Sequence, residues 1–180
     1  NPKGGVGKTP FTLALAAAIA RYRGAGSIAC ADLSETRGSL TDRAGIPPHY
    51  CQHVLDFLAA VKNEAGGVRP SILARYLVRQ PDGSDIIAGV PEGVGSLSFD
   101  DAQDLGQVLA QHRELLIADT GNTTIAGSWQ WAVQTASALV VPVPLRRDAA
   151  TAAHRMLLDL PTTNGSDALA RTIVVITDGP

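Results

Sequence analysis

Apolar residues along this chain recur with two different spacings, and segments of the two kinds alternate. Short apolar runs bounded by polar, glycine or proline residues predict buried strands at 27–31, 85–90, 115–118, 138–141 and 172–176. Between them apolar residues return every three or four positions, which predicts helices at 10–23, 49–62, 71–79, 100–112, 126–136 and 148–158. The polar segment 33–48 is predicted to be a loop. Strands that alternate with helices in this way predict an α/β fold with a mostly parallel sheet and helices on both faces.

Proline, glycine and serine mark several ends of these elements. Pro10 stands at an early position of the first helix, and Gly24 follows its last turn. Ser71 is predicted to cap the helix that begins there. Pro142 and Pro144 are predicted to end the fourth strand, because a proline cannot donate to a β-ladder.

A glycine-rich loop precedes the first helix. Its glycines allow the backbone to curl so that successive N–H groups point at a phosphate, and the positive end of the helix faces the same anion. Lys8 places an ammonium on the β- and γ-phosphates, and Thr9 offers a hydroxyl to Mg²⁺. The loop therefore predicts a nucleotide site, and its candidate binding residues are Gly4, Gly5, Val6, Gly7, Lys8, Thr9 and Pro10.

Two further strands end in a carboxylate. The apolar run 115–118 leads into Asp119, at the sheet edge where ligands of open α/β sheets bind, and an acidic group there can hold Mg²⁺. Gly121 could offer its N–H to the γ-phosphate. The run 27–31 leads into Asp32. A strand-end Asp often only caps the next element, and this reading stays open for Asp32.

The string KGGVGKT at residues 3–9 resembles the deviant Walker A motif of the MinD/ParA family of P-loop ATPases. Pro2 takes the place of the first glycine of the strict P-loop pattern, and Lys3 is the family's extra lysine. The resemblance implies a three-layer P-loop fold that binds ATP and Mg²⁺. It also implies that Lys3 reaches the nucleotide of a partner subunit, in an ATP-dependent homodimer.

The same resemblance extends to both strand-end segments. The Asp119 segment is similar to Walker B and switch II, and the segment from Asp32 to the turn at 37–40 is similar to the first switch. The resemblance implies that Thr9, Asp119 and Asp32 lie around the metal. It implies catalytic roles for Lys3, Lys8 and Asp32.

Two positions depart from the family. Ser34 falls where an acidic residue orients the attacking water, and a serine cannot accept a proton from water at neutral pH as a carboxylate can. The adjacent Glu35 is the candidate to replace it, so slow hydrolysis and binding without hydrolysis both stay open. Pro10 replaces a hydroxyl residue that contacts the α-phosphate, which should weaken binding by roughly 1 kcal/mol.

Composition narrows the function further. The 180 residues suit one domain over 1–180, and a net charge of −2 gives no general attraction to nucleic acid or anionic membranes. The two cysteines form no CxxC pair, which argues against a thiolate metal site.

No apolar run approaches the ~20 residues of a membrane span, and a cytoplasmic location is the simplest expectation. Because nothing precedes the loop at Asn1, we expect a piece of a longer protein that lacks its first strand and its C-terminal elements; DNA or membrane binding through such regions stays open.

Two polar or aromatic clusters remain. Trp129 and Trp131 are two positions apart and cannot share a helix face, so we expect one inside and one outside, the outer one a candidate anchor for a partner. Arg146 and Asp148 follow a strand tip and could meet a phosphate, a partner or only solvent.

The resemblance implies an ATP-driven dimerisation switch whose turnover a protein partner regulates, and which positions DNA, division machinery or secretion apparatus. Two other functions stay open. One is a metabolic P-loop enzyme, and the other is a degenerate nucleotide-binding scaffold with little or no hydrolysis.

Overall fold

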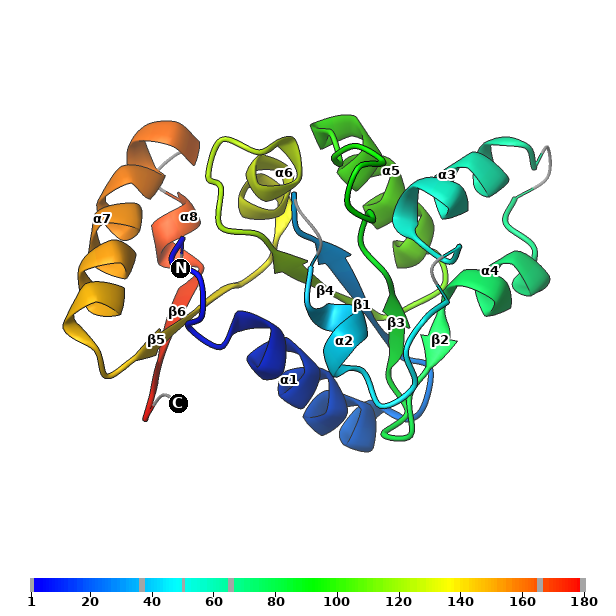
Figure 1. Ribbon diagram of the computed structural model, residues 1–180, viewed down its shortest axis with the longest axis horizontal. Helices are drawn as coiled ribbons and strands as arrows, with labels where there is room; N and C mark the ends of the chain where they lie inside the picture. The colour runs from blue at the N-terminus through cyan, green and yellow to red at the C-terminus, as the bar shows by residue number, and fades with distance from the viewer. Residues whose placement is uncertain (1, 36–37, 50, 65–66, 165–166, 179–180) are drawn as a thin grey trace.

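The computed structural model describes residues 2–35, 38–49, 51–64, 67–164 and 167–178. These residues form two sheets, one with strand order β2-β3-β1-β4 and one that pairs β5 with β6 (Figure 1). The strands are β1 (Ile28–Leu33), β2 (Val78–Arg79), β3 (Asp85–Ile87), β4 (Leu115–Thr120), β5 (Leu139–Pro144) and β6 (Thr172–Thr177). The helices are α1 (Lys8–Arg23), α2 (Leu40–Arg43), α3 (Val54–Lys62), α4 (Pro70–Tyr76), α5 (Phe99–Ala110), α6 (Gly127–Thr135), α7 (Arg147–Asn164) and α8 (Asp167–Ala170). Among these pairs β2–β3 is antiparallel and the rest are parallel, which confirms the α/β fold with a mostly parallel sheet.

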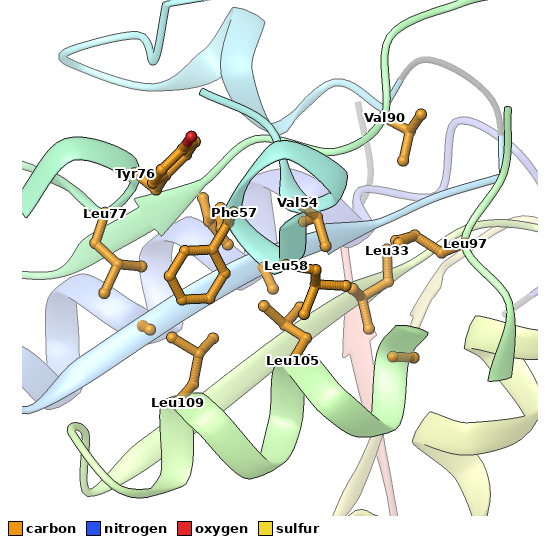
Figure 2. Packing of buried hydrophobic residues seen from close by; sticks show 14 of the residues in the cluster. Leu33, Val54, Phe57, Leu58, Tyr76, Leu77, Val90, Leu97, Leu105 and Leu109 are labelled. Carbon is orange, nitrogen blue, oxygen red and sulfur yellow. The ribbon is translucent and has the colours of Figure 1, made fainter. Parts of the chain in front are cut away.

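Strand β1 lies at the centre of the packing, and every one of its residues is buried. Ile28 and Cys30 face α1, in a cluster with small side chains of that helix. The alternate residues Ala29, Ala31 and Leu33 face a second cluster, built with α3, α4, α5 and α6. Figure 2 shows Leu33 of β1 among the side chains of α3 and α5. Helices therefore cover both faces of the first sheet, as the alternation of elements predicts.

The register of β1 and β4 sets the position of the two strand-end carboxylates. The two strands pair in parallel, with Asp32 opposite Asp119 and Leu33 opposite Thr120. Both aspartates are buried, and both lie at the carboxyl edge of the sheet. The loops that follow β1 and β4 therefore begin side by side, next to the loop that leads into α1.

Strand β5 includes Pro142 and ends at Pro144, so the prediction that the strand closes at Val141, before Pro142, is wrong. The N–H of Leu139 donates to the residue before β6, and the N–H of Leu145 donates to the last residue of β6. Odd-numbered residues thus direct their N–H groups to β6, and both prolines direct their nitrogens to the other edge. The prolines interrupt no bond of the β5–β6 ladder, which is why the strand continues through them.

Other predicted boundaries also differ from the structure: the strand predicted at 85–90 ends at Ile87, and the helix predicted at 148–158 extends to Asn164. The helix predicted at 71–79 begins at Pro70, whose fixed φ suits the first turn, so Ser71 is not its cap. Its predicted end instead forms the short strand β2, antiparallel to β3. Helix α3 begins only after His53, whose ring accepts a hydrogen bond from the Asp56 N–H. The segment predicted as a loop at 33–48 contains the short helix α2.

Both tryptophans of α6 are buried, so the prediction that one faces outward as a partner anchor is wrong. Trp131 packs in the cluster between the first sheet and α3, α4 and α5, close to Gly106 of α5. Trp129 packs in another cluster, with side chains of β5 and α7. Helix α6 lies between two cores, and each core contains one of its indoles.

No helix within the described ranges is long and apolar enough to cross a lipid bilayer.

Candidate nucleotide-binding site

The loop before α1 adopts the backbone that its glycines permit. Gly5 and Gly7 have φ values of 69° and 85°, in the left-handed region that other residues avoid. Gly7 is the N-cap of α1, and no side chain caps the helix. The first N–H groups of α1 are therefore left to point out of the helix end, an arrangement suited to an anion.

A cavity of about 600 Å³ opens beside this loop. All eight predicted binding residues line it, and so do Glu35 and Ser34. Sequence reasoning did not assign the other lining residues, which are Gly38, Ser39, Arg43, Thr120 and Asn122. Ser39 lies in the recognised turn at 37–40 and Asn122 directly follows Gly121, whereas nothing in the sequence pattern marks Arg43. Lys3, Asp32 and Asp119 do not line the cavity.

Lys8 lines the cavity, and its ammonium makes two hydrogen bonds. Nζ donates to the carbonyl of Lys3 at 3.2 Å and to the side-chain oxygen of Asn122. Partial burial lowers the pKa of Lys8, and the charges of Asp119 and Glu35 oppose that shift. The ammonium is thus held in place by one backbone and one side-chain acceptor, next to two carboxylates.

Asp119 and Thr9 form the part of the site that suits a metal ion. Asp119 is 3% exposed, and its Oδ2 has no hydrogen-bond partner in the part of the chain that the structure describes. Burial raises the pKa of Asp119 to about 6, although a hydrogen bond from Thr9 lowers it. The Thr9 hydroxyl also accepts from Ser39 Oγ at 3.0 Å. An unsatisfied buried carboxylate oxygen beside a hydroxyl fits a hard cation such as Mg²⁺.

Asp32 organises the loop that follows β1. Its Oδ1 accepts from the N–H of Ser34 at 3.1 Å, and its Oδ2 accepts from the N–H of Leu40 at 3.3 Å. Burial raises the pKa of Asp32, and the bonds from Ser34 and Leu40 lower it. A Cβ on Gly38 would lie 1.9 Å from Oδ2, so glycine is required for this close approach. Residue 37, the first of the predicted turn, lies outside the described residues.

Glu35 turns inward to the cavity. Its Oε1 is buried and without a hydrogen-bond partner among the described residues. A Cβ on Gly121 would lie 2.0 Å from Glu35 Oε2, so the carboxylate rests against the backbone that follows β4. Ser34 also lines the cavity, but its N–H is bonded to Asp32.

The loop after β5 contacts the glycine-rich loop. Lys3 Nζ lies 2.7 Å from Asp148 Oδ2, and Arg146 Nη2 donates to the Gly5 carbonyl at 3.3 Å. The hydrogen bond from Lys3 lowers the pKa of the Asp148 carboxyl. The sequence left open whether Arg146 meets a phosphate, a partner or only solvent. In the structure its guanidinium is bonded to the backbone of the glycine-rich loop.

A larger hollow of about 860 Å³ lies at the opposite end of the first sheet, between α4, β2 and the residues 46–49 and Gln52. Its two arginines, Arg79 and Arg113, both pair with the buried Asp85. That carboxylate ties β2, β3 and the turn before β4 together. The helix N-terminus, Lys8 and Glu35 line the smaller cavity, and Asp119 is hydrogen-bonded to Thr9 of its lining, so we place the candidate site there.

Comparison with known proteins gives a consistent fold. No protein-family model matches the sequence, and no curated protein matches it. A ParA family ATPase from Chlorobium tepidum superposes with a TM-score of 0.80 at 16% identity, over 99% of this chain and 71% of that chain. MinD in the MinC:MinD complex of Aquifex aeolicus superposes with a TM-score of 0.64 at 18% identity, over 97% and 65% of the two chains. The chain has the ParA/MinD fold.

The ParA/MinD fold is shared with an enzyme of another kind. Cobyrinic acid a,c-diamide synthase from Mycobacterium smegmatis, solved with an ATP analogue and magnesium, superposes with a TM-score of 0.65 at 19% identity, over 97% of this chain and 69% of that chain. Identities this low establish the fold and leave the reaction to be argued from the site.

Proposed function

We propose that this protein binds ATP with Mg²⁺, hydrolyses it slowly and uses it to dimerise. The observation that carries the proposal is that the helix N-terminus of α1, the Lys8 ammonium and the Glu35 carboxylate line one cavity. Asp119, hydrogen-bonded to Thr9 of the same lining, keeps a buried oxygen that has no partner among the described residues. Each group suits one part of a triphosphate–magnesium complex, and a bound ligand would satisfy the two carboxylate oxygens that have no partner among the described residues.

Each residue has a part in that proposal. The N–H groups of Gly4 to Thr9 and the Lys8 ammonium bind the phosphates, and Gly121 offers a further N–H near the γ-phosphate. Thr9 and Asp119 would hold Mg²⁺, which would neutralise charge on the phosphate oxygens. Asp32 acts at one remove, because both of its oxygens are bonded to the loop that carries Ser34 and Glu35.

Glu35 is the group that we assign to the attacking water. It faces the cavity with a buried, unpartnered oxygen, so it can accept a hydrogen bond from water, whereas Ser34 offers no carboxylate. A glutamate carries its carboxylate on a longer and less constrained side chain than an aspartate. Slow turnover follows from that placement.

Lys3 is the residue that we assign to the partner subunit's nucleotide. Its ion pair with Asp148 is well exposed, with side-chain exposures of 39% and 55%, so solvent screens it and little energy opposes its exchange for a phosphate. The same proposal includes a partner that regulates turnover, the positioning of DNA, division or secretion machinery, and a cytoplasmic location. The similarity to a chain of the MinC:MinD cell division complex supports the part that concerns a partner and division.

The test of ATP binding uses the chain's own lysines. Lys8→Ala should abolish binding of a fluorescent ATP analogue in the presence of Mg²⁺, because the mutation removes a charge-assisted contact to the phosphates. Lys62→Ala is the matched control, since Lys62 lies on α3 with an exposed side chain and does not line the cavity. Equal affinity of the two variants would overturn the proposal.

The same preparation separates the alternative functions. Glu35→Gln should lower single-turnover hydrolysis by about 10²-fold or more, the range of general-base contributions. If Glu35→Gln leaves turnover unchanged and Ser34→Asp raises it, the water belongs to position 34. Absence of turnover in the wild type would favour the scaffold. ATP turnover by a protein that stays monomeric with a non-hydrolysable analogue would favour a metabolic enzyme, the function named for the cobyrinic acid synthase relative.

A further inference from the structure

Asn122 is the one side chain beyond the glycine-rich loop that bonds to the Lys8 ammonium within the described residues. It stands two residues after the end of β4, and its Oδ1 accepts from Lys8 Nζ. The other end of its amide lies over the loop as well, because a Cβ on Gly4 would be 3.5 Å from Asn122 Nδ2. Through this side chain the segment 121–126, which joins β4 to α6, contacts the phosphate-binding loop.

The hydrogen bonds of the Lys8 ammonium show what the contact with Asn122 can do. An ammonium has three N–H donors, and in Lys8 one goes to the Lys3 carbonyl and one to Asn122. Two fixed acceptors define the direction of the third donor. A lysine side chain loses rotamer entropy when it is held in one place. A group that holds the ammonium before a phosphate is bound therefore improves affinity by preorganisation.

We propose that Asn122 is a positioning residue, which fixes the Lys8 ammonium for the phosphates and couples its position to the segment 121–126. This inference rests on the nucleotide site proposed above. It adds a residue that acts through Lys8, and it makes the lysine and the segment after β4 move together. Because coupling between two groups is reciprocal, a change at Lys8 must also alter the segment.

The test begins with the protein without nucleotide and measures amide hydrogen exchange in peptides that cover 121–126. Asn122→Ala and Lys8→Ala should each raise exchange there, because each removes one end of the same bond. The double variant should exchange no faster than the faster single variant. Additive effects would show that the two residues act separately and would overturn the inference.

Nucleotide affinity gives the second measurement. Asn122→Ala should weaken binding of Mg²⁺-ATP about 10-fold, a typical loss for a hydrogen bond to a charged group. Asn122→Asp keeps an oxygen for Lys8, so it should retain the exchange protection of 121–126 while its added negative charge weakens ATP binding. A residue that only stabilises the segment would not separate these two readings.

Thr123→Ala is the matched control, since Thr123 is the next residue of the same exposed segment and does not line the cavity. It should change neither exchange nor affinity. Unaltered exchange in Asn122→Ala, or unaltered ATP affinity in that variant, would overturn the inference. Failure of the wild type to bind ATP would instead overturn the proposed function, and the exchange experiment would still report on the Asn122–Lys8 contact.

Discussion

Strand β1 of the first sheet and strand β6 of the second are similar in apolar character, but they are buried to very different extents. In the first sheet every residue of β1 is buried. In the second, three apolar residues of β6 are exposed, with Ile173 at 53%, Val174 at 46% and Ile176 at 68%. The apolar run at 172–176 is as continuous as the one at 27–31. An apolar run therefore identifies a strand, while the elements that neighbour it decide how much of it is buried.

The neighbours differ in a simple way. Strand β1 has a hydrogen-bonded strand on each side, and helices pack on both of its faces. Strand β6 pairs with β5 alone among the described strands, and none of its residues belongs to the cluster that β5 forms with α6, α7 and α8. If this difference governs stability, equal substitutions in the two regions will have unequal effects.

The largest expected contrast lies between two leucines in helices. Leu105 of α5 is fully buried and Leu158 of α7 is 62% exposed. Leu105→Ala should lower the free energy of unfolding by about 2–5 kcal/mol, and Leu158→Ala by less than about 0.5 kcal/mol. Urea denaturation measures both. Similar losses would mean that a further structure covers α7 in solution.

The next prediction concerns the free energy that burial of the Asp119 carboxylate costs the folded state. Because the pKa of Asp119 is raised to about 6, the folded state binds a proton more tightly than the unfolded state does. The penalty is full above pH ~6 and disappears as pH falls towards ~4, the ordinary value for Asp. Asp119→Asn should therefore stabilise the protein at pH 7.5 by up to about 3 kcal/mol, and this advantage should vanish at pH ~4.

Urea denaturation in EDTA without nucleotide, at several pH values, measures that difference. A constant advantage at all pH values would attribute the gain to something other than the carboxylate. Added Mg²⁺ and ATP should reverse the order at neutral pH, because only the wild type keeps the carboxylate.

A smaller effect distinguishes the cores through the two tryptophans. Trp129→Phe leaves an indole in the core of the first sheet, and Trp131→Phe leaves one in the core beside β5 and α7. If the second region is less stable by about 1 kcal/mol, its fluorescence midpoint in urea should lie roughly 0.5 M lower. Midpoints from fluorescence and circular dichroism that coincide within each variant would show one cooperative unit instead.

The smallest expected effect is that of the ion pair between the two regions. Asp148→Asn removes the partner of Lys3, but both side chains are well exposed and solvent screens their attraction. We expect no measurable change in the urea midpoint. A clear loss of stability, greater at low salt than at high salt, would mean that this contact holds the second region against the glycine-rich loop.

The sequence predicted the parts of the molecule that depend on local pattern. KGGVGKT specifies its own loop, and the strands that end at Asp32 and Asp119 lie side by side because parallel strands share a carboxyl edge. Glu35 was found from the departure at Ser34, a comparison made along the chain. Such features need no knowledge of distant neighbours.

The features that were missed depend on neighbours far apart in sequence. The burial of both tryptophans requires two cores on either side of α6, which no helical pattern reveals. Arg43 and Asn122 reach the cavity only because the loops after β1 and β4 meet. Strand β5 continues through its prolines because their nitrogens point away from β6, and that direction is known only once the pairing is known.

The direction of those prolines also bears on how the protein behaves when crowded with copies of itself. Along the side of β5 away from β6, Pro142 and Pro144 provide no N–H, and Val140 is the one residue of the strand whose N–H points there. An incoming strand would find too few donors to build a regular ladder. The prolines stand at alternate positions, which keeps the β5–β6 ladder intact and also makes the other edge of β5 unfavourable for pairing with a second molecule. Replacing both prolines with valine should therefore make the protein more prone to form fibrils.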